Sequence, residues 1–226
     1  MSKFFDSIGN TIENILVTAP SWLRWIYIKP VMYFFTRTFK SLIEEKNDMT
    51  VIGFAKNIVS YFPGGYNIGQ VCSIVDKINY NFKYVYSVET EGIRSAKEQI
   101  LYGFYGSCEE YSVLIAALVG SIGGSVRLVF ALGKGDGHVY PEVFIGNLED
   151  VKKVSNFISK FYLRYQQATI GHQVIHINFH RDPNGNYWLS LDMNPYLYAG
   201  NFYFDSIYEI ALYPNGEYNE IYIKGY

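Results

Sequence analysis

Three residues whose side chains together suit nucleophilic catalysis are Cys108, His138 and Asp192 of this 226-residue chain. Cys108 lies just before the apolar run 113–119, which places its thiol at the first turn of a predicted helix. His138 opens a strand-like stretch, and Asp192 closes another. A helix N-terminus and a nearby imidazolium lower the pKa of a thiol, and a carboxylate fixes the orientation of an imidazole. The types and positions of these residues therefore predict a thiol nucleophile, a general base and an acid that orients the base.

The order of these pieces resembles the transglutaminase-like superfamily of papain-type cysteine enzymes. That pattern has Gly-x-Cys on a helix, a strand with an arginine, His-x-aromatic-x-Glu, and aromatic residues before Leu-Asp. The matching segments here are 106–108, 124–129, 138–143 and 188–192. The resemblance covers roughly residues 50–226, and segments 71–84 and 95–101 resemble the family's approach to the cysteine.

The resemblance implies an α+β fold with a papain-like core, in which the nucleophile helix packs on an antiparallel sheet and N-terminal helices precede it. It also implies roles: Cys108 as nucleophile, His138 as general base and Asp192 as orienting group. It implies no cofactor and no metal. One departure is the long interval between His138 and Asp192, where we expect an inserted helix over 148–165 and an extra strand over 174–180.

Hydrophobic periodicity and turn residues predict the remaining elements. Helices are expected over 51–61, 68–80 and 108–120. Strands are expected over 126–132, 139–145, 174–180, 187–191, 207–213 and 218–223. The Pro-Asn-Gly turns at 183–185 and 214–216 are typical of tight connections and predict two hairpins. Helices followed by an antiparallel sheet indicate an α+β domain.

Residues 1–48 are expected to form an extension separate from a catalytic domain over 49–226, because 44–48 is a polar break. Apolar residues between 4 and 15 recur at helical spacing. Between 15 and 43 every charged side chain is basic and interleaved with aromatic rings, the basic residues being Arg24, Lys29, Arg37 and Lys40. Two interpretations stay open: helices that pack back on the core, or a surface that contacts an anionic membrane or a protein partner.

Composition and charge limit the partners and the cellular location that we expect. A net charge of −2 gives no reason to expect a nucleic-acid partner. The two cysteines, Cys72 and Cys108, form no disulfide framework and fit a reducing compartment. We find no secretory signal, and charged residues and Pro30 interrupt the aromatic stretch 22–39, so a cytoplasmic protein, peripheral to a membrane at most, is expected.

Other polar residues have simpler explanations. His172, His176 and His180 have a metal-like spacing, but the alternation of 175–180 is that of a strand, on which residues four apart lie about 13 Å from each other. We therefore expect His176 and His180 to face solvent. Asp182 belongs to a turn, and Asn194 is a rival to Asp192 as the orienting group. Glu142 matches the pattern of the resembled family, and a purely structural bridge is its alternative role.

These observations favour cysteine-dependent acyl transfer on an amide of a peptide or protein, by hydrolysis or transamidation. The alternative is a catalytically inactive binding module with the same fold, docking through residues 1–48.

Overall fold

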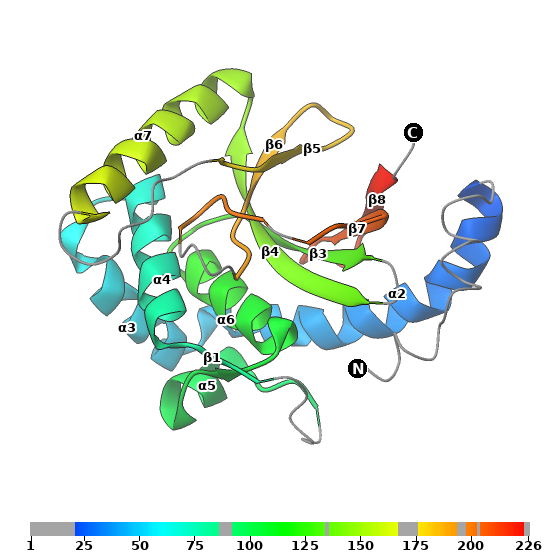
Figure 1. Cartoon of the computed structure of the whole chain (residues 1–226). Helices are drawn as coiled ribbons and strands as arrows, with labels where there is room; N and C mark the ends of the chain where they lie inside the picture. The colour runs from blue at the N-terminus through cyan, green and yellow to red at the C-terminus, as the bar shows by residue number, and fades with distance from the viewer. Residues whose placement is uncertain are drawn as a thin grey trace.

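The computed structural model describes residues 21–85, 92–133, 136–166, 176–193, 198–202 and 204–223. Helices come first and an antiparallel sheet follows, with one long helix between its strands (Figure 1). The helices are α2 (Ser21–Glu44), α3 (Met49–Ile58), α4 (Ile68–Asn81), α5 (Ala96–Tyr102), α6 (Cys108–Ser121) and α7 (Leu148–Gln166), with 3-10 turns at Glu45–Asn47 and Val59–Tyr61. The strands are β1 (Lys83–Tyr84), β2 (Tyr105–Gly106), β3 (Val126–Leu132), β4 (Gly137–Gly146), β5 (Phe179–Arg181), β6 (Tyr187–Ser190), β7 (Tyr208–Leu212) and β8 (Tyr218–Ile223). This confirms the predicted α+β class.

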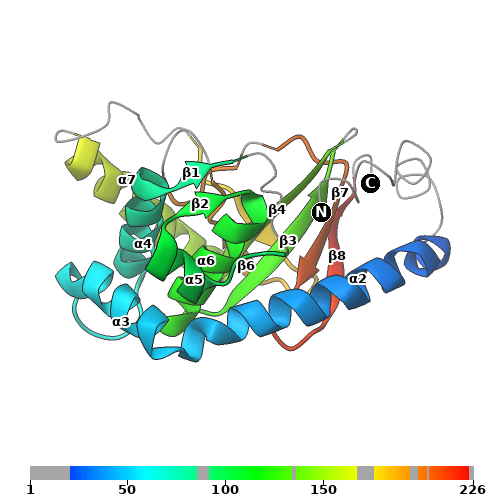
Figure 2. The ribbon, with the colours of Figure 1, turned by 90° about the horizontal axis from the view of Figure 1, so that it is seen from below.

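Helix α6 is the central helix of the fold. Every residue from Glu110 to Val119 is buried. A helix that is apolar on all sides, rather than along one stripe, must be surrounded by protein. Strands β3 and β4 contact α6, and so do helices α2, α3, α4 and α5 (Figure 2). The first residue of this well-anchored helix is Cys108.

The main sheet has the strand order β5-β6-β4-β3-β7-β8, and all its neighbouring strands are antiparallel. Strands β3 and β8 match their predicted ranges to the residue. The two predicted Pro-Asn-Gly turns join β5 to β6 and β7 to β8. Gly185 (φ 86°) and Gly216 (φ 91°) adopt the left-handed conformation that glycine tolerates.

The two faces of the sheet have different neighbours. On β4, Val139 and Val143 belong to the main core with α6. Successive strand residues point to opposite faces, and Tyr140 belongs instead to a small second cluster. Half-buried Phe202 and Phe204 pack over that cluster. The second face is thus covered by the chain segment that leads into β7.

Helix α2 packs against the rest of the fold through one side. Met32, Phe35, Phe39 and Ile43 are buried in the main core, and the Phe35 and Phe39 rings lie 4.5 and 5.4 Å from the Phe130 ring of β3, centroid to centroid. Figure 2 shows α2 running beneath the sheet and α6. The helical periodicity predicted between residues 4 and 15 lies outside the described residues.

The inserted segment differs partly from expectation. Helix α7 confirms the helix predicted over 148–165. The strand predicted over 174–180 is wrong at 176–178, and β5 begins only at Phe179. The pairing at Asn178 is irregular: its N–H donates to Gly200 O at 2.7 Å while its carbonyl accepts from Ser190 N at 3.2 Å, so the regular ladder with β6 begins only at Phe179. Residues 174 and 175 lie outside the described residues.

Candidate active site

The start of α6 positions the Cys108 thiol. Ser107 is the N-cap, its hydroxyl accepts from the backbone N–H of Glu109, and the Glu110 carboxylate accepts from the Ser107 N–H at 2.9 Å. This reciprocal capping box satisfies donors that a helix start leaves open. Among the described residues no acceptor contacts the Cys108 N–H, so it is available to a ligand.

Gly106 allows the chain to reach this helix closely. Its φ is 151°, and a Cβ built there would meet the Cβ of Glu110 at 2.7 Å. A side chain at position 106 would therefore collide with the capping carboxylate that fixes the helix start.

Ser112 ties the start of α6 to the neighbouring strand. Its hydroxyl lies 2.6 Å from the carbonyl oxygen of Cys108 and 2.9 Å from that of Val139, the residue after His138. One side chain thereby joins the segment that bears the thiol to the segment that bears the imidazole.

His138 and Asp192 lie in direct contact. Nε2 of His138 is 2.7 Å from Oδ1 of Asp192, and their side chains are 16% and 3% exposed. Asp192 follows β6 by two residues, and its neighbour Leu191 donates from its backbone N–H to Pro141 O on β4. Backbone pairing between β4 and the end of β6 thus holds the carboxylate beside the imidazole.

The thiol also influences the imidazole. Cys108 acts on the pKa of His138 in the same direction as Asp192, which lies at Nε2 of the ring. Burial by itself would lower the pKa of His138. The charge of Asp192 and the hydrogen bonds to Asp192 and Cys108 outweigh burial and raise that pKa to about 10. The structure therefore brings the three sequence-predicted residues together in the order thiol, imidazole, carboxylate.

The carboxyl groups of the first turn of α6 adjust the charge near the thiol. Burial, and then the charge of Glu110, raise the pKa of Glu109, while hydrogen bonding to Ser107 and the charge of His138 oppose the rise. The Ser107 hydroxyl lies 2.7 Å from Glu109 Oε2 and 2.8 Å from Glu110 Oε2.

A second polar cluster lies behind the first, on the β4 face that carries Tyr140. Arg127 Nε donates to Glu142 Oε2 at 2.7 Å, and both side chains are fully buried. The Arg127 guanidinium also lies 4.3 Å from the centre of the Trp188 ring and bonds the Tyr213 hydroxyl at 2.9 Å. This contact agrees with the structural alternative for Glu142.

The prediction that His180 faces solvent is wrong. Its side chain is only 24% exposed, its Nδ1 contacts Glu142 Oε1, and its Nε2 lies 3.5 Å from Glu209 Oε2. The physical reason is the cover over the second sheet face, which alternation along a strand does not reveal. Sequence reasoning missed Glu209 altogether, although the alternation of the predicted strand 207–213 places it on the face opposite Tyr208 and Ile210.

The rival carboxyl and amide groups have the following positions. Asp182 accepts from the backbone N–H groups of Asn184 and Asn186 and from Trp188 Nε1, so turn chemistry accounts for it as predicted. Asn194 and His172 lie outside the described residues.

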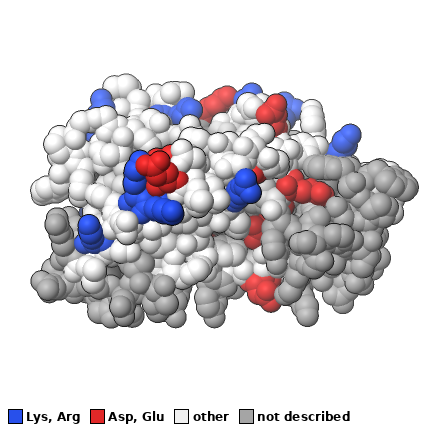
Figure 3. Space-filling view, turned by 90° about the horizontal axis from the view of Figure 1, so that it is seen from above, with Lys and Arg blue, Asp and Glu red and all other residues white. Residues whose placement is uncertain are grey.

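Three further features concern ligands. Among the described residues, no group of three His, Cys, Asp or Glu side chains could hold a metal ion. No helix in the described ranges is long and apolar enough to cross a membrane. Seen from above, the described surface is mostly uncharged, with Lys, Arg, Asp and Glu in small separate groups (Figure 3).

A helix-borne thiol, a strand-borne imidazole and a buried carboxylate on this scaffold define an α+β protein of the papain-like type. The family model of the transglutaminase-like superfamily matches residues 55–193, a range that contains all three groups. The chain belongs to this superfamily. No curated protein and no solved structure matches it in the other two comparisons.

Proposed function

We propose that the protein catalyses cysteine-dependent acyl transfer from an amide of a peptide or protein. The observation that carries the proposal is the position of His138, between the Cys108 thiol and the Asp192 carboxylate. A thiol, an imidazole and a carboxylate in this order suit the activation of a nucleophile by an oriented base.

Cys108 Sγ attacks the amide carbon and forms a tetrahedral adduct, while its proton resides on His138. The backbone N–H of Cys108 donates to the developing oxyanion. When the adduct collapses, the C–N bond breaks, a thioester forms, and His138 delivers the proton to the departing amine. Water or a second amine then attacks the thioester and transfers a proton to His138; the C–S bond breaks, the acid or the new amide is released, and Cys108 returns as a thiolate beside the protonated imidazole. The pairing with Asp192 holds the imidazole in orientation throughout.

Selective alkylation tests the proposal, because the chain carries its own control thiol. Cys72 is fully buried, and burial followed by the charge of Asp76 raises its pKa well above the ordinary value. We expect iodoacetamide at pH 6–8 to modify Cys108 and leave Cys72 unmodified. His138→Asn should slow modification of Cys108 about tenfold or more at pH 6. Peptide mapping by mass spectrometry separates the two sites.

Trapping the intermediate is the second arm. After exposure to activated acyl donors and rapid acid quench, Cys108 should carry a thioester adduct that Cys108→Ala lacks. Ordinary thiol reactivity in wild type, unchanged by His138→Asn and without any adduct, would instead support the inactive binding module.

A further inference from the structure

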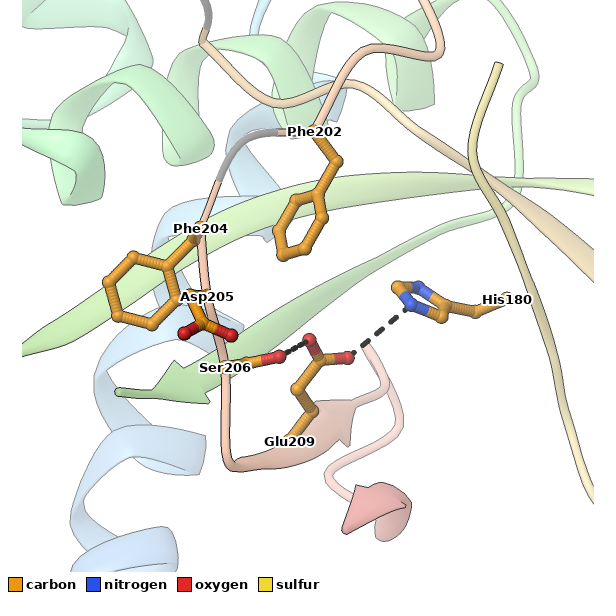
Figure 4. A pocket seen from close by; sticks show the side chains of 6 residues that line it. All are labelled: His180, Phe202, Phe204, Asp205, Ser206 and Glu209. Atoms are coloured by element: carbon orange, nitrogen blue, oxygen red, sulfur yellow. Dashed lines mark hydrogen bonds and ion pairs between the residues drawn. The ribbon is translucent and has the colours of Figure 1, made fainter. Parts of the chain in front are cut away.

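A small pocket lies on the second face of the sheet, next to the candidate active site (Figure 4). Its volume is about 240 Å³, and its lining residues are His180, Phe202, Phe204, Asp205, Ser206 and Glu209. Pockets for whole drug-sized ligands are usually larger, roughly 300–1,000 Å³, so this volume suits a single side chain.

The pocket and the candidate catalytic imidazole share one wall. The Phe204 ring stacks on His138 with centroids 5.3 Å apart, and the same residue lines the pocket. The Phe204 ring therefore contacts both the imidazole and the pocket. The pocket thus lies on the side of the candidate active site that carries His138.

The lining contains more carboxyl groups than basic groups. Two carboxyl groups, Glu209 and Asp205, line the pocket with a single imidazole, His180. The ring nitrogens of His180 are directed at carboxylates, Nδ1 at Glu142 and Nε2 at Glu209, the latter marked in Figure 4. An anion would face two carboxylates here.

The aromatic walls favour the same kind of ligand. Phe202 and Phe204 are half-buried and line the pocket, and the faces of such rings attract ammonium and guanidinium groups. Glu209 is held in place by Ser206, whose hydroxyl donates to Oε1 at 2.5 Å, and by the Tyr140 hydroxyl, which donates to Oε2 at 3.3 Å. Its carboxylate is thus pre-oriented at the pocket wall.

We propose that this pocket binds an alkylammonium or guanidinium side chain of the substrate, on the leaving-amine side of the attacked amide. The side follows from the reaction: His138 delivers its proton to the departing amine, so the leaving group lies over the imidazole and next to Phe204. This assignment rests on the proposed function. It makes the substrate a peptide with lysine or arginine just after the bond that is broken.

Binding without turnover tests the pocket by itself. Full-length protein is titrated with butylammonium, butylguanidinium, 1-pentanol and pentanoate at low salt, and dissociation constants are measured by saturation-transfer NMR. Both cations should bind about tenfold more tightly than 1-pentanol, a factor that corresponds to about 1.4 kcal/mol, and pentanoate should not bind. Equal binding of butylammonium and 1-pentanol would overturn the proposal.

Two variants test which carboxyl groups bind the cation. Glu209→Gln keeps the shape of a buried side chain, whereas Asp205→Asn changes an exposed one and should leave the fold intact. Each should weaken cation binding about threefold to tenfold and leave 1-pentanol binding unchanged. Glu149→Gln, an exposed acid on α7, is the matched charge control and should change nothing. Cation binding unaffected by Asp205→Asn and by Glu209→Gln would contradict the assignment.

Catalysis provides the separate arm. Between peptides that differ only by lysine or norleucine after the attacked amide, kcat/KM should favour lysine about tenfold, and Asp205→Asn should reduce that ratio. The NMR titration requires no reaction, so the two proposals can fail separately. Cations can fail to bind although Cys108 is reactive, and cations can bind although Cys108 is unreactive.

Discussion

At the scale of single residues, two buried pairs of opposite charge occupy neighbouring strands and differ in what surrounds them. Arg127 and Glu142 are completely enclosed, and aromatic rings and a tyrosine hydroxyl complete the Arg127 environment. His138 and Asp192 lie at the end of the strands, where the imidazole keeps some exposure and a thiol neighbour. The first arrangement suits a structural bridge, and the second leaves a titratable group in reach of a ligand.

Replacing Asp192 with Asn tests the orienting role. Without the charge that opposes burial, the pKa of His138 should fall well below its wild-type value of about 10. Turnover of an amide substrate should fall about 10²–10⁴-fold, since a base in the wrong orientation transfers protons poorly. Ring-proton NMR follows the pKa, and initial rates follow turnover. An unchanged rate would assign the orienting role to another group.

The ion pair also predicts a pH dependence of stability. The pKa of His138 is raised from 6.5 to about 10 in the folded chain, so the pair's contribution is fully present below pH 6.5 and is lost as pH rises through 10. Relative to Asp192→Asn, the free energy of unfolding should fall by roughly 1–3 kcal/mol across that window. Urea titrations in a Cys108→Ser background remove the thiol's own ionisation. Parallel curves for the two proteins would contradict the prediction.

At the scale of elements, helix α6 and strands β3 and β4 were predictable because their signals are local. The apolar run 113–119 and the apolar stretches of the two strands indicate these segments directly from the sequence. The short strand β5 was not predictable in extent, since Asn178 pairs with the distant Gly200. The surroundings of His180 depend equally on what covers the second face. Periodicity assigns a residue to a face and leaves its neighbours unknown.

The approach to α6 predicts a contrast between two glycines. Gly106→Ala should displace the capping Glu110 and the thiol, lowering activity at least about tenfold, since misplacement by about 1 Å can cost 100-fold. Gly53 is exposed within α3, and a Cβ there meets nothing within 4 Å. Gly53→Ala should therefore stabilise the protein by about 0.5–1 kcal/mol with normal activity. Kinetics and urea unfolding of both variants make the comparison, and equal activities would refute the role of Gly106.

At the scale of the whole molecule, helix α2 of the N-terminal segment packs on the core with one side and exposes a row of side chains on the other. The inner side of α2 packs against Phe130. Among its exposed residues a series recurs every three or four positions, namely Ile26, Lys29, Tyr33, Arg37 and Lys40, and the acidic Glu44 continues it. Tyr33 is 71% and Ile26 58% exposed. A stripe of cations with apolar side chains suits an anionic lipid surface. Peripheral membrane contact through residues 1–48 remains our proposal, as does the domain division at residue 48.

Vesicle binding tests this stripe without removing a helix that packs on the core. Full-length protein should sediment with phosphatidylserine vesicles at low salt. Lys29→Gln, Arg37→Gln and Lys40→Gln combined should weaken binding by more than tenfold, at about 1 kcal/mol per charge. Lys152→Gln and Lys160→Gln on α7 provide the control for loss of positive charge. Binding that is equally strong in both variants, or absent in wild type, would count against membrane contact.

The Ser112 hydroxyl, which bridges main-chain carbonyls of the thiol-bearing helix and the imidazole-bearing strand, has an evolutionary consequence. The separation of the two reactive groups is governed by main-chain atoms of rigid elements. We therefore expect that pocket residues that do not touch the imidazole, such as Asp205, can change, and with them the choice of substrate, while the thiol and the imidazole keep their separation.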